Sequence, residues 1–227
     1  MPFFWDVLGD PVADLLLPRY CLACAAPGQP LCAACRPTEV LRPPQAGIPT
    51  VAAGAYEGAL RTALLAYKER GRRDLAAALA DLLAGCVTAL GPPPGAVLVP
   101  VPSSARAARA RGGDHVLRLA RRVAARTGLR PAGGVLELGR AVRDSAGLST
   151  GERAANLAGA MRARRPTGPI PAVLVDDIVT TGATLAEAAR ALRAVGWNVL
   201  GGVVVGATRL HRRAGPDRVG QPTRNGT

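Results

Sequence analysis

The sequence has few aromatic side chains, few histidines and no long apolar run. Aromatic residues make up 3% of its 227 residues, there are two histidines, and the longest apolar stretch is VLGGVVVGA at 199–207. That stretch is far shorter than the roughly 20 residues that span a bilayer, which excludes a typical transmembrane helix. The first residues carry Asp6, Asp10 and Asp14 and lack the basic region of a secretory signal. We therefore expect a cytoplasmic protein.

Basic residues greatly exceed acidic ones. The chain has 29 Lys and Arg against 16 Asp and Glu, a formal net charge of +13. Such a surface attracts polyanions, namely nucleic acid, anionic membranes or phosphorylated small molecules. A compositional bias toward Arg that yields only solvated surface charge explains the same excess. A scaffold that binds only single-stranded DNA is disfavoured, because few aromatic rings are available to stack on bases.

The sequence divides into three parts. Residues 1–45 combine an amphipathic helix over about 1–17 with a short module rich in Cys and Pro. Residues 46–207 alternate apolar runs with helical patterns. Residues 208–227 carry five Arg and little apolar content, and we predict that this tail is disordered.

The alternation within residues 46–207 predicts an α/β fold. Continuous Val, Leu and Ala runs are typical of strands buried on both faces, and amphipathic segments between them are typical of crossover helices. We expect a parallel sheet with helices on both faces. The expected strands are 50–56, 96–102, 170–177 and 197–207. The expected helices are 57–69, 73–90, 114–127, 151–163 and 184–196.

Four of the five cysteines lie within the segment CLACAAPGQPLCAAC. Its two CxxC pairs each direct two thiolates toward one point, and together they complete the tetrahedron of a closed structural zinc site. Paired cysteines in a cytoplasmic protein are more often metal ligands than disulfides, although dithiols with a redox role or no role are the alternative. The predicted zinc ligands are Cys21, Cys24, Cys32 and Cys35. The fifth, Cys86, is expected to be a buried small hydrophobe.

The stretch VLVDDIVTTGATL at 173–185 carries the strongest functional signal. A buried strand ends in two adjacent carboxylates, Asp176 and Asp177, and a turn of Thr and Gly leads into a helix. Ligands of open parallel sheets bind beyond the carboxyl ends of strands, and N–H groups at a helix start attract phosphate. The acids suit sugar hydroxyls or hydrated Mg²⁺. The stretch therefore predicts a sugar-phosphate site, with a helix-capped surface turn as the alternative.

This stretch resembles the phosphoribosyl pyrophosphate (PRPP) signature of type I phosphoribosyltransferases. Together with the CxxC pairs, YKERG, VPVPSSARAARARGGDH and GLSTGERAANLAGAM, it is similar to the ComF family. That family comprises competence-associated, phosphoribosyltransferase-like proteins with an N-terminal zinc ribbon. The similarity covers about residues 18–207 and includes Arg153 and Asn156 of an RxxN motif. It implies a type I phosphoribosyltransferase-like fold with a small zinc-ribbon-like module built on the four cysteines.

The resemblance implies roles for individual residues. Asp176 and Asp177 would be the catalytic pair and would bind the ribose hydroxyls of PRPP. The 5′-phosphate would be held by Thr180, Thr181, Gly182, Ala183 and Thr184. Pyrophosphate would lie at Pro100, Val101, Pro102 and Ser103, with the basic residues Arg106, Arg111 and Lys68. Basic groups and Mg²⁺ would stabilise the charge that grows on departing pyrophosphate.

Two functions are compatible with these residues. The first is an enzyme that transfers phosphoribosyl from Mg²⁺–PRPP to an acceptor that the sequence does not identify. The second is a non-catalytic PRPP-binding or nucleic-acid-associated protein that engages single-stranded DNA or the DNA-uptake machinery in competence. A homo-oligomer is compatible with either function.

The chain departs from the family at two places near the expected acceptor position. It reads RGGDH where the family reads RGFNQ, so that Gly113, Asp114 and His115 replace an aromatic residue, an Asn and a Gln. It also has Ser145 where the family often has a Gln just before GLS. A histidine at the start of a helix is more typical of a structural role. A structural role is therefore what we expect for His115.

Overall fold

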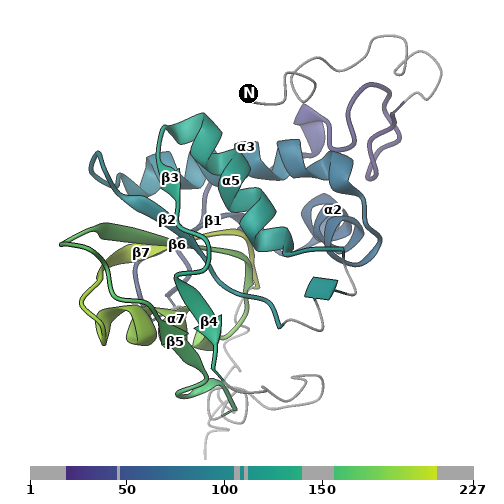
Figure 1. Ribbon diagram of the computed structural model, residues 1–227. Helices are drawn as coiled ribbons and strands as arrows, with labels where there is room; N and C mark the ends of the chain where they lie inside the picture. Colours follow the sequence, from purple (N-terminus) through teal and green to yellow (C-terminus); the bar gives the residue numbers. More distant parts are fainter. Residues whose placement is uncertain (1–18, 45–46, 105–107, 110–111, 140–155, 209–227) are drawn as a thin grey trace, which may run out of the picture.

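The computed structural model of the chain describes residues 19–44, 47–104, 108–109, 112–139 and 156–208 (Figure 1). The predicted N-terminal helix and nearly all of the predicted disordered tail lie outside these residues. Arg106, Arg111 and Arg153 lie outside them as well.

A five-stranded sheet lies at the centre of the fold (Figure 1). Its strand order is β1-β7-β6-β2-β3, and every neighbouring pair is parallel. The strands are β1 (Thr50–Ala55), β2 (Val97–Pro100), β3 (Arg130–Pro131), β6 (Pro171–Val179) and β7 (Asn198–Ala207). Because β6 is the middle strand, it is flanked by a hydrogen-bonded neighbour on each side.

Side chains that alternate along β6 divide the interior into two cores. Val173 and Val175 pack into the core on one face of the sheet, whereas Ala172 and Leu174 pack into the core on the other face. All four are fully buried. A strand that is covered on both faces has no solvated side, which explains why its sequence is a continuous apolar run.

Helices cover both faces of the sheet (Figure 1). On the first face lie α2 (Gly58–Glu69), α3 (Ala76–Leu90) and α5 (His115–Thr127), and on the second lies α7 (Ala183–Arg193). A 3₁₀ turn, η4 (Arg73–Leu75), leads into α3. Among the described residues, no helix is long and apolar enough to cross a membrane.

The predicted parallel sheet with flanking helices is confirmed. All four predicted strands form, and β6 continues two residues beyond its predicted end because its pairing with β7 persists at Ile178↔Gly206 and Val179↔Ala207. Asp176 and Asp177 therefore lie within the last part of the strand rather than at its very end. Backbone hydrogen bonds of β6 thus hold the two acids in place.

The predicted helix over 151–163 is wrong at its C-terminal end. Met161–Ala163 form the strand β5, which pairs antiparallel with β4 (Leu136–Leu138). Met161 is buried, and its N–H donates to the buried carboxylate of Glu187 on α7 at 3.0 Å. Arg190 donates to Glu187 and to the carbonyl of Met161. These tertiary contacts outweigh the helical propensity of the Ala-rich segment.

The Cys-rich segment packs against the helical layer beside α3 (Figure 1). Leu31 is fully buried and belongs to the first core. Arg36 forms an ion pair with Asp81 of α3 at 3.5 Å, and Asp81 is also paired with Arg126 of α5. Exposed ion pairs contribute little to stability, so burial of Leu31 is the stronger attachment.

Gly201 of β7 lies where a side chain has no room. A Cβ there would overlap the carbonyl oxygen of Pro49, which accepts the N–H of Gly202 at 2.8 Å and is thereby held in place. We expect Gly201→Ala to lower the free energy of unfolding by about 1–3 kcal/mol, the usual range for overpacking. Urea unfolding measures the difference, and a variant as stable as the wild type would contradict this packing.

Gly85 on α3 offers a matched control for that substitution. It is exposed, and a Cβ there would meet no atom within 4 Å. Gly85→Ala should therefore raise the free energy of unfolding by about 0.5–1 kcal/mol, because alanine is the better helix former.

Candidate functional site

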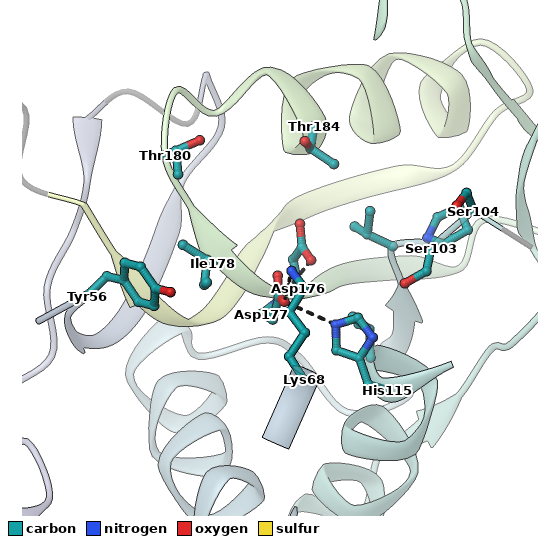
Figure 2. A pocket seen from close by; sticks show the side chains of 13 residues that line it. Tyr56, Lys68, Ser103, Ser104, His115, Asp176, Asp177, Ile178, Thr180 and Thr184 are labelled. Atoms are coloured by element: carbon teal, nitrogen blue, oxygen red, sulfur yellow. Dashed lines mark hydrogen bonds and ion pairs between the residues drawn. The ribbon is translucent and has the colours of Figure 1, made fainter. Parts of the chain in front are cut away.

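A pocket of about 460 Å³ opens at the carboxyl edge of the sheet, where β2 and β6 end (Figure 2). Four parts of the chain form most of its wall: β6 with the turn after it, the loop after β2, the end of α2 and the start of α5. The lining residues are Tyr56, Lys68, Val101, Pro102, Ser103, Ser104, His115, Val116, Asp176, Asp177, Ile178, Thr180 and Thr184. This edge is where parallel α/β sheets bind ligands.

The turn after β6 brings a helix N-terminus to the pocket. Gly182 precedes α7 with φ of 78°, a left-handed conformation that glycine adopts without steric cost. Thr180 and Thr184 line the pocket on either side of it, and Thr181 accepts the N–H of Ala183 at 3.4 Å. Glycine has no side chain to cap the helix, so an anionic ligand is suited to the N–H groups of the first turn.

Asp177 is a buried carboxylate that two side chains hold. Its Oδ2 atom lies 2.7 Å from Nζ of Lys68 and 3.0 Å from Nε2 of His115. Burial alone would raise the pKa of Asp177, but the hydrogen bond from His115 and the charge of Lys68 hold that pKa well below its ordinary value. Asp177 is therefore ionised at neutral pH.

Asp176 has a different environment from its neighbour. Its Oδ1 atom accepts the backbone N–H of Asp177 at 2.8 Å. Burial, together with the charge of Asp177, raises the pKa of Asp176 well above its ordinary value. Figure 2 shows its carboxyl group directed into the pocket, on the side of Thr184, whereas Asp177 is directed to Lys68 and His115. The side chains of the two acids thus point in different directions, and their pKa values shift in opposite directions.

His115 is fixed at the start of α5. The preceding Asp114 caps the helix, since its Oδ1 atom accepts the N–H groups of Val116 and Leu117 at 2.9 and 3.0 Å. The hydroxyl of Tyr67 donates to the carbonyl of His115 at 3.0 Å, and the two rings meet edge to face. Among the described residues, the buried Nδ1 atom of His115 has no hydrogen-bond partner.

Most of the predicted site residues meet in this one pocket. Those that line it are Asp176, Asp177, Thr180, Thr184, Lys68, Val101, Pro102 and Ser103. The others within the described residues are Thr181, Gly182 and Ala183 of the turn, and Pro100 at the end of β2. Arg106 and Arg111 lie outside the described residues, so their predicted role stays a prediction.

Sequence reasoning did not select Tyr56 for the site and favoured a structural role for His115. The structure brings both to the pocket wall, together with Ser104 at the end of the predicted pyrophosphate segment VPVPSS. The two residues that hold Asp177 belong to residue types that are rare in this sequence, and this rarity could have indicated their roles. Lys68 is the only lysine among 29 basic residues, and His115 is one of two histidines. Because lysine and arginine are not interchangeable, a single lysine in an Arg-rich chain marks a place that suits a compact ammonium group.

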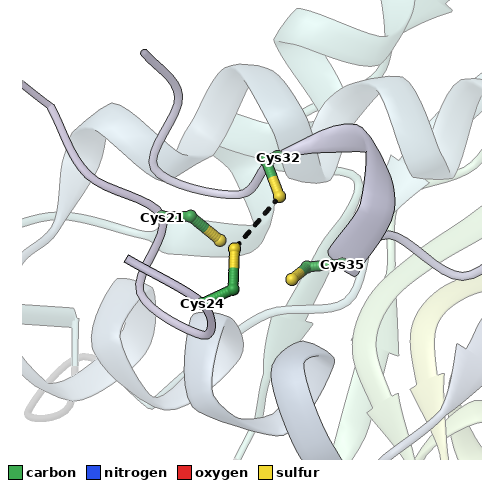
Figure 3. A group of neighbouring side chains, drawn as sticks. All are labelled: Cys21, Cys24, Cys32 and Cys35. Carbon is green, nitrogen blue, oxygen red and sulfur yellow. Dashed lines mark hydrogen bonds between the residues drawn. The ribbon is translucent and has the colours of Figure 1, made fainter. Parts of the chain in front are cut away.

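The four predicted zinc ligands converge near the N-terminus (Figure 3). The sulfur atoms of Cys21, Cys24, Cys32 and Cys35 all lie within 4.8 Å of one another. Four zinc–sulfur bonds of about 2.3 Å in a tetrahedron place the sulfur atoms about 3.8 Å apart, which lies within this limit. The thiols therefore fit a closed metal site such as that of structural zinc. Thiolate ligands at all four corners leave no open position for catalysis.

The thiol pKa values show that these cysteines share one electrostatic environment. Burial would raise the pKa of Cys21, but backbone N–H groups, that of Cys32 foremost, lower it to about 6. Hydrogen bonding to Cys24 and Cys32 raises the pKa of Cys35 to about 12. Thiolates held this close together repel one another, and a bound cation offsets that repulsion. Cys86, in contrast, is the buried residue that the sequence predicted.

Comparison with models of known protein families and with curated protein sequences finds no match for this chain. The resemblance to the ComF family accordingly stays a prediction based on the motifs quoted above. The class of protein that fold and site define is a parallel α/β protein with a polar pocket at the carboxyl edge of its sheet. A cluster of four cysteines near the N-terminus accompanies it.

Metal content tests the cysteine cluster. We expect purified protein to carry about one zinc ion per chain, measured by inductively coupled plasma mass spectrometry. Cys24→Ser should release the metal and destabilise the N-terminal segment, because a tetrahedral site loses one thiolate. Cys86→Ser, which removes a thiol from α3 instead, should retain the ion. Folded wild-type protein without metal would contradict the assignment.

Stability measurements test the opposite environments of the two acids. Asp177→Asn should lower the free energy of unfolding at pH 7 by about 1.5–3 kcal/mol, because it weakens hydrogen bonds to a charged group. Asp176→Asn should leave stability unchanged or increase it, since it removes a buried acid that its neighbour repels. Urea unfolding of both apo variants checks this, and equal effects would contradict the asymmetry.

The pH dependence of these variants has a defined sign. The folded pKa of Asp177 lies below that of the unfolded chain, about 3.9, so its stabilisation is present above that pH. The deficit of Asp177→Asn should therefore shrink only as the pH falls below about 4. A deficit that disappeared already between about pH 7 and pH 5 would point to a group other than Asp177.

Proposed function

We propose that the pocket binds Mg²⁺–PRPP and that the chain is a type I phosphoribosyltransferase-like protein that transfers phosphoribosyl to an acceptor. One observation carries this proposal: a buried acidic pair, a threonine turn at a helix N-terminus and the loop after β2 meet in one pocket. The pocket volume of about 460 Å³ falls within the usual range for small-molecule sites.

Each part of PRPP has a chemically suited partner in this pocket. The hydroxyl groups of ribose donate to carboxylates, which the acidic pair supplies. The 5′-phosphate suits the N-terminus of α7, where Thr180 and Thr184 add hydroxyl donors. Pyrophosphate suits Ser103 and Ser104 of the loop after β2, and the ammonium group of Lys68 lines the same pocket. A ligand with a sugar between two phosphate groups uses all three regions at once.

The acidic pair also fits a hydrated Mg²⁺ ion. Carboxylate oxygens are preferred ligands for this ion, which retains several waters and binds through one or two carboxylates plus substrate phosphates. Asp176, whose carboxyl group is directed into the pocket, is the residue that would hold it (Figure 2). When bound, Mg²⁺ neutralises charge on the phosphate groups.

The transfer itself exchanges one bond at C1 of the ribose for another. The acceptor's lone pair forms a bond to C1 as the bond from C1 to pyrophosphate breaks, and pyrophosphate leaves with both electrons. Lys68 lies at 2.7 Å from Asp177 and lines the same pocket, so its ammonium group can stabilise the leaving anion. The carbon that carries positive charge in the transition state would face the acids.

Calorimetric titration of Mg²⁺–PRPP tests the binding step. We expect the wild type to bind, and Asp176→Asn to bind about ten- to a hundredfold more weakly, because it loses the carboxyl group that would hold Mg²⁺ and accept a ribose hydroxyl. Asp81→Asn is the matched control, since Asp81 pairs with Arg36 and Arg126 on the helical layer and does not line the pocket. Absence of binding by the wild type would refute the proposed function.

Pyrophosphate release separates an enzyme from a sensor. Incubation of the wild type with Mg²⁺–PRPP and a panel of nucleobases should release pyrophosphate with one of them. Binding without release would favour the non-catalytic alternative. Tight, salt-sensitive binding of single-stranded DNA without PRPP binding would instead favour the nucleic-acid-associated alternative.

A further inference from the structure

His115 makes one contact that is needed neither to start α5 nor to fill the core. Its Nε2 atom lies 3.0 Å from Asp177. An ionised carboxylate only accepts hydrogen bonds, so Nε2 must carry the ring proton. The side chain is 4% exposed, and Nδ1 has no partner among the described residues. Buried polar atoms are nearly always paired, so space filling alone does not account for this ring.

Asp177 is restrained from two directions. Lys68 reaches it from the end of α2, and His115 reaches it from the start of α5. Both bonds end on the same oxygen, Oδ2. Asp176 is held mainly by the backbone N–H of Asp177, which its Oδ1 atom accepts, although the charge of Lys68 also acts on it. Its carboxyl group is directed into the pocket (Figure 2).

We propose that His115 is a positioning residue for the acidic pair. With Lys68 it anchors Asp177, and this leaves Asp176 as the carboxyl group that contacts a ribose hydroxyl. The second half of this inference depends on the proposed function, whereas the anchoring of Asp177 does not. The two adjacent acids thus have unequal roles. Asp176 contacts the ligand directly, whereas Asp177, held by its anchors, fixes the end of the strand that carries Asp176.

Nuclear magnetic resonance of the histidine rings tests the anchoring without any ligand. The full chain has two histidines, so His211→Gln assigns both signals. In ¹⁵N-labelled protein we expect His115 to be the tautomer protonated at Nε2. Asp177→Asn should shift the Nε2 proton signal, and Asp176→Asn should leave the tautomer unchanged. A ring protonated at Nδ1 alone would overturn the proposal.

Sugar phosphates test the unequal roles of the acids. The probes are ribose 5-phosphate and 2,3-dideoxyribose 5-phosphate, which lacks the two ring hydroxyls but keeps the phosphate. We expect the wild type to prefer ribose 5-phosphate by about two- to tenfold, the usual effect of a hydrogen bond. Asp176→Asn should abolish most of that preference, and retention of the preference would overturn the assignment of Asp176.

Two substitutions of His115 complete the test. His115→Ala should reduce the preference because Asp177 loses an anchor, and His115→Gln should restore it because glutamine supplies an N–H donor. Folded His115→Ala with wild-type preference, or folded His115→Gln without restoration, would overturn the positioning role. If His115→Ala does not fold, the ligand preference of His115→Gln and the NMR signals of the wild-type His115 ring still test the positioning role.

The outcomes keep this inference separate from the proposed function. A wild type that binds neither Mg²⁺–PRPP nor ribose 5-phosphate refutes the proposed function and the role of Asp176. In that case the NMR signals of the His115 ring still test whether His115 anchors Asp177. A wild type that binds PRPP while His115→Ala behaves like it refutes the positioning role and leaves the proposed function intact.

Discussion

Two carboxyl groups on adjacent residues of a buried strand are the constraint on which the site depends. Each loses most of its hydration, and each repels the other. Lys68 and His115 compensate one of them, and they come from α2 and α5, which pack on the same face of the sheet. The charge of Asp177 therefore couples the placement of two helices to the middle strand. The arrangement of α2 and α5 that packs the core is also the one that brings Lys68 and His115 to Asp177 in the pocket.

Hydrophobic pattern was sufficient to predict the sheet and its helices. The runs around Val173 and Val203 are buried on both faces, and such strands are continuous in sequence. The strand β3 and the antiparallel pair β4 and β5 were not predicted, because two or three residues show no periodicity. The C-terminal end of β6 was placed two residues too early. That end depends on pairing with β7, and the sequence of β6 alone does not show which residues pair.

Local chemistry predicted the acids, the turn and the cysteines, since each of these groups is contiguous in sequence. The side chains that approach from elsewhere were harder to foresee. His115 and Asp177 are 62 positions apart, and their contact depends on how α5 lies over β6. Tyr56 follows β1, yet it reaches the pocket because β1 and β6 both flank β7 in the sheet. Such contacts follow from topology, which spacing within one segment does not reveal.

The single lysine of this chain has a consequence for its chemistry in solution. Its other 28 basic side chains are arginines, which do not act as nucleophiles at neutral pH. Reagents that acylate or alkylate amines therefore have one side-chain target, Lys68, and that target lies in the wall of the pocket. The α-amino group is distinguishable, because its pKa is about 8 whereas that of a lysine is about 10.4. Covalent labelling of one amine thus reads out pocket occupancy without any introduced reporter.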